Sequence, residues 1–248
     1  ENACSPLIVD DLVIIYGGGP QESFLAFDKD SGKVKWKTGS ELATHAMPIL
    51  AKIHGVEQVV FFCQSGLVSL LPKSGEELWR QGFPYKVSTA ASPVVAGDLV
   101  YCSAGYGVGA GLYKISKRGS KFSSSQVWRK PNDLINHWST PVYHDGHLYG
   151  MFSFKKYGDG PLQCVELKTG MVKWSEDGYG PGNVILAGKH LLALSDKGEL
   201  SVVKASSSHY QELARKKLIS GKCWSTPILS EGKVLIRSTE EALCLSVN

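Results

Sequence analysis

The chain has 248 residues, of which 43% are hydrophobic and 20% are charged, and its formal net charge is +4. This composition excludes intrinsic disorder, and the length allows a sizeable hydrophobic core. The charge is too small and too scattered to indicate a nucleic-acid surface, and no apolar run approaches the roughly 18 residues that a membrane span needs.

An apolar run opened by a proline returns along the chain about every 45 residues. Five copies begin with a proline, and Asn183 stands where the series requires another. A period of this length, when it is built from strands, indicates a propeller or a solenoid. The prolines are Pro6, Pro48, Pro93, Pro141 and Pro227.

Each repeat contains short strand patterns separated by turn signals. A hairpin with an Asp/Gly turn comes first, as in 94–100, and a third strand follows a loop that is often rich in glycine. The third strands are expected at 23–27, 66–71, 111–115, 162–167, 199–203 and 242–245. No stretch has a convincing helical period, and 211–217, which comes nearest, occupies the outer-strand position of the fifth repeat. We therefore predict an all-β chain.

A tryptophan closes a turn phrase in phase with the prolines. The phrase Ser/Thr-Gly-x-x-x-Trp ends at Trp36, Trp79 and Trp174, and Trp128 belongs to a longer variant. We expect the phrase to lead into a fourth, outer strand. A large flat ring there can cover apolar surface on the next sheet, so we interpret these tryptophans as packing residues.

These two phrases resemble the pyrroloquinoline-quinone-type (PQQ-like) β-propeller repeat of quinoprotein alcohol dehydrogenase-like and BamB-like propellers. The resemblance covers nearly the whole chain and implies one propeller domain over residues 1–248, made of four-stranded antiparallel blades. The expected blades are 4–40, 43–83, 87–131, 136–177, 180–219 and 222–248.

The sixth repeat contains only three strand patterns, because no Gly-x-x-x-Trp phrase follows its third strand. Proteins with this repeat usually have eight blades. The resemblance therefore implies either part of a longer eight-bladed propeller, which we favour, or a shortened ring with a three-stranded closing blade.

The six cysteines have no Cys-x-x-Cys spacing and no adjacent pair, which excludes the usual zinc sites. Four of them lie in strand patterns and are interpreted as small buried hydrophobic residues: Cys63, Cys102, Cys164 and Cys244. Cys4 and Cys223 precede matching strands of the first and last repeats, and they could pair if those repeats touched.

Three motifs are more simply explained by the repeat than by a ligand. The Gly-x-Gly-x-x-Ala sequence at 105–110 continues into a strand pattern, so no helix is available to bind a pyrophosphate. The sequence 28–32 is the repeat turn rather than a calcium loop, which would need a closing glutamate. His144 and His147 occupy the hairpin turn of the fourth repeat, so we assign no metal site.

The candidate site residues come from positions where the repeats differ. His45, His137 with Trp138, and Cys223 with Trp224 lie just before prolines that lead into innermost strands, beside the expected axial funnel. They either bind a planar ligand or a peptide or simply plug the channel. Tyr106 lies on a glycine-rich loop that could rim the funnel, and Lys155, Lys156 and Tyr157 lie on the equivalent loop of the fourth repeat.

Two functions follow from the resemblance. The first is a non-catalytic binding or scaffold propeller, bacterial and periplasmic or otherwise exported, which holds a protein or small ligand at its funnel or blade edges and needs no cofactor. The second is a PQQ-dependent alcohol or sugar dehydrogenase with calcium, whose site missing blades would complete. We favour the first, because the chain lacks the adjacent cysteine pair of the dehydrogenases and we can assign no catalytic or calcium-binding carboxylate.

Overall fold

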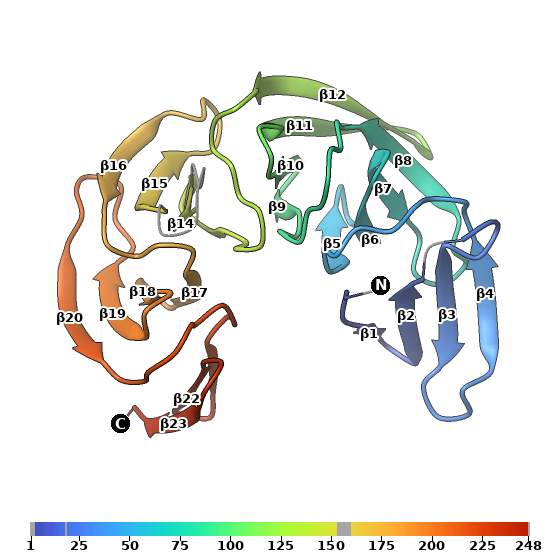
Figure 1. The fold of residues 1–248 in the computed structure, drawn as a ribbon. Helices are drawn as coiled ribbons and strands as arrows, with labels where there is room; N and C mark the ends of the chain where they lie inside the picture. The colour runs from blue at the N-terminus through green and yellow to red at the C-terminus, as the bar shows by residue number, and fades with distance from the viewer. Residues whose placement is uncertain (1–2, 18, 153–159, 248) are drawn as a thin grey trace. The chain divides into compact units, whose positions relative to one another are not determined.

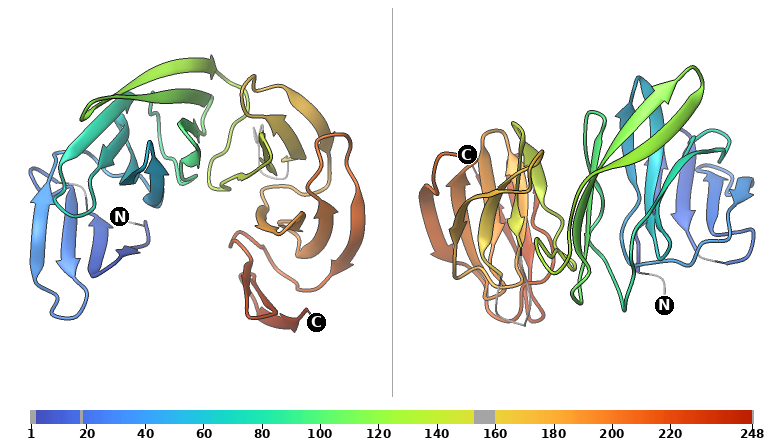
Figure 2. Two further views of the ribbon diagram at one scale, coloured as in Figure 1. Left: turned by 180° about the vertical axis from the view of Figure 1, so that it is seen from behind. Right: turned by 90° about the horizontal axis from the view of Figure 1, so that it is seen from above.

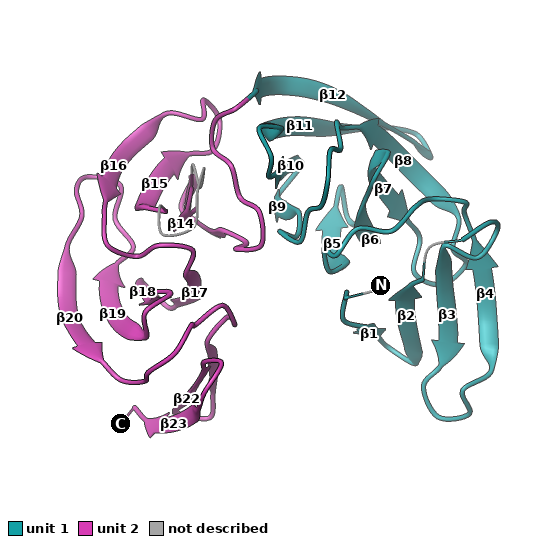
Figure 3. Cartoon of the chain, in the orientation of Figure 1, with its two compact units in different colours: residues 1–131 teal, residues 132–248 magenta. Residues whose placement is uncertain are grey.

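The computed structural model describes residues 3–17, 19–152 and 160–247, and every regular element in these ranges is a β-strand (Figure 1). The residues group into two compact units, 1–131 and 132–248 (Figure 3). Each unit contains three antiparallel sheets built from consecutive strands. Each sheet lies within one of the expected repeats.

Unit 1 contains three four-stranded sheets. Sheet 1 consists of β1 (Leu7–Val9), β2 (Leu12–Tyr16), β3 (Phe24–Asp28) and β4 (Val34–Thr38). Sheet 2 consists of β5 (Ile49–Ile53), β6 (Val56–Cys63), β7 (Gly66–Leu70) and β8 (Glu77–Gly82). Sheet 3 consists of β9 (Val94–Ala96), β10 (Leu99–Ala104), β11 (Gly109–Arg118) and β12 (Lys121–Lys130). The strands β11 and β12 have 10 residues each and form a long hairpin (Figure 2). In it, the Ser124 hydroxyl donates to the Arg80 carbonyl of β8 at 2.8 Å.

Unit 2 contains two four-stranded sheets and one of three strands. Sheet 4 consists of β13 (Val142–His144), β14 (His147–Met151), β15 (Leu162–Glu166) and β16 (Val172–Glu176). Sheet 5 consists of β17 (Asn183–Ala187), β18 (His190–Leu194), β19 (Glu199–Lys204) and β20 (Glu212–Lys217). Sheet 6 consists of β21 (Ile228–Ser230), β22 (Lys233–Arg237) and β23 (Ala242–Ser246). The predicted all-β fold, with six repeats and three strands in the last, is therefore confirmed.

The hairpins form where the sequence supplies residues that accept a positive φ. In the turn between β13 and β14, Asp145 and Gly146 have φ values of 45° and 79° between the paired residues His144 and His147. Two-residue turns of this kind match the twist of the flanking strands. His144 and His147 are therefore cross-strand neighbours because the turn between them has two residues.

A bulge recurs where the third strand pairs with the fourth. In each of the five four-stranded sheets, the register shifts by one residue at an equivalent position. The shifts fall at Ala26/Phe27, Ser69/Leu70, Leu112/Tyr113, Cys164/Val165 and Val202/Val203. The tryptophan of each phrase pairs with the residue just before the shift, so the bulge sets which face of the sheet the ring covers.

Trp36 shows how the ring reaches the next sheet. Its indole N–H donates to the Pro72 carbonyl of sheet 2 at 2.8 Å. Gly75 lies directly under the ring, because a Cβ added there would come within 2.6 Å of it, and its φ is 71°. The glycine of one turn phrase thus makes room for the tryptophan of the preceding repeat, and the packing role predicted for this ring is confirmed.

Apolar clusters join neighbouring sheets within each unit. Between sheets 1 and 2, the rings of Phe24 and Phe61 lie 4.3 Å apart, and Tyr16 contacts both. Trp79 is 3% exposed and belongs to the cluster between sheets 2 and 3. Trp174 lies in the cluster between sheets 4 and 5, where its N–H donates to the Ser206 carbonyl at 2.7 Å.

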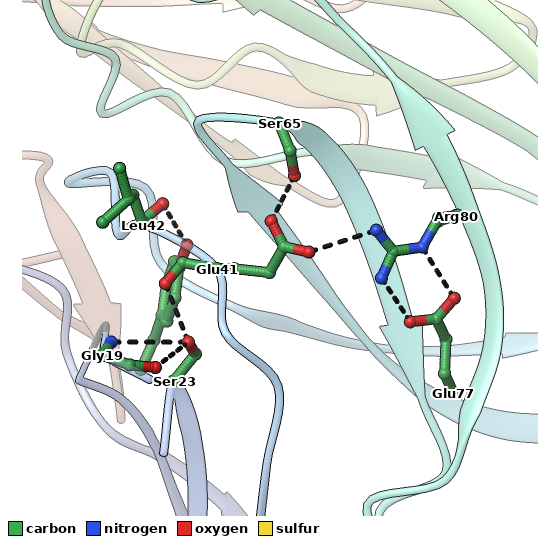
Figure 4. A network of polar contacts seen from close by, with 8 residues as sticks. Gly19, Ser23, Glu41, Leu42, Ser65, Glu77 and Arg80 are labelled. Atoms are coloured by element: carbon green, nitrogen blue, oxygen red, sulfur yellow. Dashed lines mark hydrogen bonds and ion pairs between the residues drawn. The ribbon is translucent and has the colours of Figure 1, made fainter. Parts of the chain in front are cut away.

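A polar clamp also joins sheets 1 and 2 (Figure 4). Glu41, in the connection between them, accepts hydrogen bonds from Ser65 and, at 3.2 Å, from Arg80. Arg80 donates to both carboxylate oxygens of Glu77, at 2.8 and 2.6 Å, and these hydrogen bonds lower the pKa of Glu77. The Glu41 carbonyl accepts from Ser23 of sheet 1 at 2.8 Å, so this connection is held from both sides.

Three of the four strand cysteines are buried as predicted. Cys63, Cys102 and Cys164 are each 0% exposed, and burial raises the pKa of the Cys164 thiol to about 11. The expectation for Cys244 was wrong: it is exposed, because its face of sheet 6 is not covered by any described residue. All six cysteines are free, including Cys4 and Cys223.

We predict that Trp79→Ala lowers the free energy of unfolding by about 3 to 5 kcal/mol, the usual range for truncating a buried aromatic ring. Denaturant unfolding provides the measurement. Trp224→Ala is the matched control, since Trp224 is 44% exposed, and it should cost about 1 kcal/mol or less. Equal losses for the two variants would contradict the packing role of Trp79.

Arg80→Gln should lower the free energy of unfolding at pH 7 by about 1 kcal/mol or less, since the Arg80 and Glu77 side chains are 56% and 41% exposed. The folded-state pKa of Glu77 is lowered, so this stabilisation is present above the unfolded pKa and is lost as the pH falls through the folded one. The difference in the free energy of unfolding between Arg80→Gln and the parent protein should therefore shrink below about pH 4. A difference that grows on acidification would contradict the assignment.

Candidate functional site

Three of the candidate residues meet in unit 2. The rings of Trp138 and Trp224 lie 6.1 Å apart with an interplanar angle of 49°, and His137 lies 4.8 Å from Trp138. Trp138 precedes β13 and Trp224 precedes β21, so the loops of two different sheets bring them together. We call Trp138 and Trp224 the tryptophan pair.

Asn183 holds the loop that carries Trp224. This residue is 2% exposed, and its amide donates to the Trp224 carbonyl at 2.9 Å. Its side-chain oxygen accepts a hydrogen bond from Thr226 at 3.3 Å. A proline could form neither hydrogen bond, so the break in the proline series marks a positioning residue. The break is visible in the sequence, but the repeat pattern alone assigns no role to Asn183.

Trp138 is also anchored, and a cation lies close to Trp224. The indole N–H of Trp138 donates to the Pro181 carbonyl at 3.3 Å. The Lys222 ammonium lies 5.1 Å from the centre of the Trp224 ring, within the range of a cation–π interaction. The tryptophan pair is therefore a held aromatic surface with a positive charge beside it, and Trp224 is 44% exposed.

The cavity beside Trp138 has a volume of about 10 Å³ and is lined by His137, Trp138, Ser139, Met151 and Pro181. The buried Ser139 hydroxyl has no hydrogen-bond partner among the described residues. One water molecule fits such a space, whereas small-molecule sites usually have several hundred Å³. The residues around the tryptophan pair therefore do not fit an enclosed quinone cofactor.

His45 and Tyr106 lie on separate loops of unit 1. His45 is exposed in the connection before β5, where its backbone N–H donates to the Thr89 carbonyl at 2.9 Å. Tyr106 is 49% exposed in the turn between β10 and β11, with a φ of 57°. Lys155, Lys156 and Tyr157 lie outside the described residues.

Buried polar side chains fix the connections that lead into β5, β9 and β13, two of which carry candidate residues. The Thr89 hydroxyl donates to the Ser103 carbonyl at 3.3 Å, and the Asn136 amide donates to the Met151 carbonyl at 2.8 Å. Thr44 bonds to the Phe62 carbonyl in the same way. Each lies four or five residues before a proline, so this spacing could have identified these positions from the sequence.

The motifs set aside in the sequence have structural roles. Asp28 accepts hydrogen bonds from the N–H and hydroxyl of Ser31, at 2.9 and 2.7 Å, and these bonds, with Lys35, lower its pKa. The glycine-rich sequence 105–110 forms a turn and the start of β11. Among the described residues, no cluster of His, Cys, Asp or Glu could hold a metal ion.

Comparison with known proteins identifies a family and a fold. Residues 1–176 match the model of the family described as outer membrane protein assembly factor BamB. No curated protein sequence matches the chain. The BamB structure from Moraxella catarrhalis is similar with a TM-score of 0.69 and 13% identity, over 96% of this chain and 70% of that one.

Two further solved structures resemble the chain. The computationally designed Ika8 protein has a TM-score of 0.68 and 11% identity, over 98% of this chain and 70% of that chain. The quinohemoprotein alcohol dehydrogenase from Comamonas testosteroni has a TM-score of 0.60 and 15% identity, over 89% of this chain and 43% of that one. At these identities the likeness concerns the fold alone, and it confirms the predicted PQQ-like propeller.

We predict that Asn183→Ala lowers the free energy of unfolding by about 1 to 3 kcal/mol, because it removes the hydrogen bond that pairs the Trp224 carbonyl. The near-ultraviolet circular dichroism of the tryptophans should change with it, since the loop loses its anchor. Ser230→Ala, at the exposed end of β21, is the control. An unchanged aromatic spectrum for Asn183→Ala would contradict its positioning role.

Proposed function

The chain belongs to the BamB family of propellers, and from this premise we propose that it is a non-catalytic binding module that holds a protein in the bacterial envelope. The tryptophan pair is the proposed contact surface. The family's description as an outer membrane protein assembly factor supports the location and the type of partner. The described residues include no helix long and apolar enough to span a membrane.

The observation that carries the proposal is the exposure of Trp224 on an anchored loop. Tryptophan is enriched among the residues that dominate protein interfaces, because a rigid ring removes much apolar surface from water at little entropic cost. Asn183 and Thr226 fix the loop before any partner arrives. This preorganisation lowers the ordering cost of binding.

The small cavity favours a protein partner over an enclosed small molecule. The cavity beside Trp138 has a volume of only about 10 Å³, so a ligand could contact only the outer surface of the two tryptophan rings. An exposed aromatic surface with a cation at its rim suits the apolar core and polar rim of a protein interface. The dehydrogenase alternative has only the fold likeness at 15% identity in its support, and a shared fold does not imply a shared reaction.

Trp224→Ala should reduce capture of the partner from a bacterial envelope extract by about tenfold or more, as expected for a central interface tryptophan. Immobilised protein and quantitative mass spectrometry of the bound fraction provide the measurement. Leu213→Ala is the matched control, because Leu213 is 51% exposed on β20 of the same unit. Both variants must keep the parent's melting temperature.

Equal capture by Trp224→Ala and the parent would exclude the tryptophan pair as the contact surface. The dehydrogenase alternative has its own test, a titration with pyrroloquinoline quinone and calcium. Saturable quenching of tryptophan fluorescence together with alcohol-dependent dye reduction would overturn the proposal of a non-catalytic module.

A further inference from the structure

The hairpin of β11 and β12 differs from its counterparts in both length and charge. Its strands have 10 residues each, whereas the third and fourth strands of the other four-stranded sheets have 5 or 6. Residues 109–130 include six lysine and arginine residues and no aspartate or glutamate, whereas each corresponding stretch of the other four sheets contains two carboxylates. The six are Lys114, Lys117, Arg118, Lys121, Arg129 and Lys130.

One face of the far half of this hairpin consists only of cations and hydroxyls. Cross-strand pairs share a face of a sheet, and so do side chains two residues apart along a strand. Three such pairs follow one another here, and all six side chains are exposed. The pairs are Lys114 with Ser125, Ser116 with Ser123, and Arg118 with Lys121. We call these six residues the donor face, because they offer hydrogen-bond donors and positive charge without a carboxylate or an apolar side chain.

The opposite face of the hairpin is held against sheet 2. Ile115 is buried, and its carbonyl accepts a hydrogen bond at 2.7 Å from Nε2 of His54, in the turn between β5 and β6. Phe122 packs against the apolar cluster between sheets 2 and 3, and Ser124 donates to the Arg80 carbonyl of β8. The donor face is therefore carried by a braced hairpin rather than by a loose loop.

The charges at the end of the hairpin are not neutralised within the described part of the chain. Lys117, Arg118 and Lys121 form no ion pair with any described residue. Lys114 lies 3.7 Å from Asp98, and both side chains remain exposed. Arg118 and Lys121 are directly opposite each other, an arrangement of like charges that destabilises a sheet. The stability of the fold does not explain this pair, whereas an anionic partner would.

We propose that the end of this hairpin binds an anionic lipid surface through the phosphate groups of its phospholipids. Lys117, Arg118 and Lys121 supply the charge, and the hydroxyls of Ser116 and Ser123 donate to phosphate oxygens beside them. This inference goes beyond the proposed function and does not depend on the tryptophan pair.

The composition of the donor face favours a lipid surface over an acidic protein. Lysine and serine are depleted in protein interfaces and aromatic residues are enriched, yet the donor face has two lysines, three serines and no aromatic residue. Attraction to anionic headgroups is of similar strength for lysine and arginine and needs no shape complementarity. Because the donor face has no apolar side chain to enter the hydrocarbon, the contact is electrostatic and should be sensitive to salt.

The test measures cosedimentation of the full chain with vesicles of phosphatidylglycerol and phosphatidylethanolamine, and phosphatidylcholine vesicles are the neutral control. Binding is expected to the anionic vesicles alone. It should be lost when salt is raised from about 0.1 M to about 1 M, which shortens the Debye length from about 10 to about 3 Å. Failure to bind the anionic vesicles, or binding that persists at high salt, would overturn the proposal.

A triple variant localises the contact. Lys117→Gln/Arg118→Gln/Lys121→Gln should lower the vesicle partition coefficient about a hundredfold, because each cation contributes about fivefold. Its melting temperature should equal or exceed that of the parent, since the opposed charges of Arg118 and Lys121 are removed.

The matched control removes the same net charge from three exposed lysines of sheet 5 and should bind the vesicles almost as well as the parent. It is Lys189→Gln/Lys204→Gln/Lys216→Gln. Equal losses for the two triple variants would assign the effect to net charge and overturn the site. If labelled poly-glutamate binds and anionic vesicles do not, the hairpin is a docking surface for an acidic protein and the proposal is wrong.

Discussion

An interior sheet of this protein must have both faces covered, because apolar side chains project from both. The central strands of sheet 2 show this constraint directly, since all five residues of β7 and the last six of β6 are buried. One face packs against sheet 1 around Phe61, and the other packs against sheet 3 around Phe62. Hydrogen bonds inside a sheet cannot supply this coverage, so stacking is what makes the individual repeat stable.

Much of this stacking could be predicted from the sequence, because the features that produce it are local and repeated. A two-residue turn requires residues that accept a positive φ, and Asp145 and Gly146 satisfy that requirement wherever the rest of the chain lies. The packing of Trp36 on Gly75 also follows from the repeat, because both residues belong to the same turn phrase and the tryptophan of one copy rests on the glycine of the next. Regular periodicity therefore predicts architecture well.

The candidate site was harder to predict, since it depends on contacts between side chains from different repeats. The aromatic residues Trp138 and Trp224 could be selected because they break the repeat, but their contact depends on Asn183, which no pattern identified as an anchor. Cys244 was wrongly expected to be buried for a related reason. Its alternating pattern is that of a covered strand, and only the neighbouring elements determine whether the cover exists.

The recurring bulge beside each outer strand has a consequence for association between molecules. A bulge twists a strand and interrupts the regular spacing of its hydrogen-bonding groups, which makes the strand a poor template for another sheet. The outer strands of five sheets are distorted in this way. The pairing of β22 with β23 has no register shift. Among the described strands at the outer side of the six sheets, β23 is thus the one that lacks this distortion, and it is the outer strand least protected against pairing with another sheet.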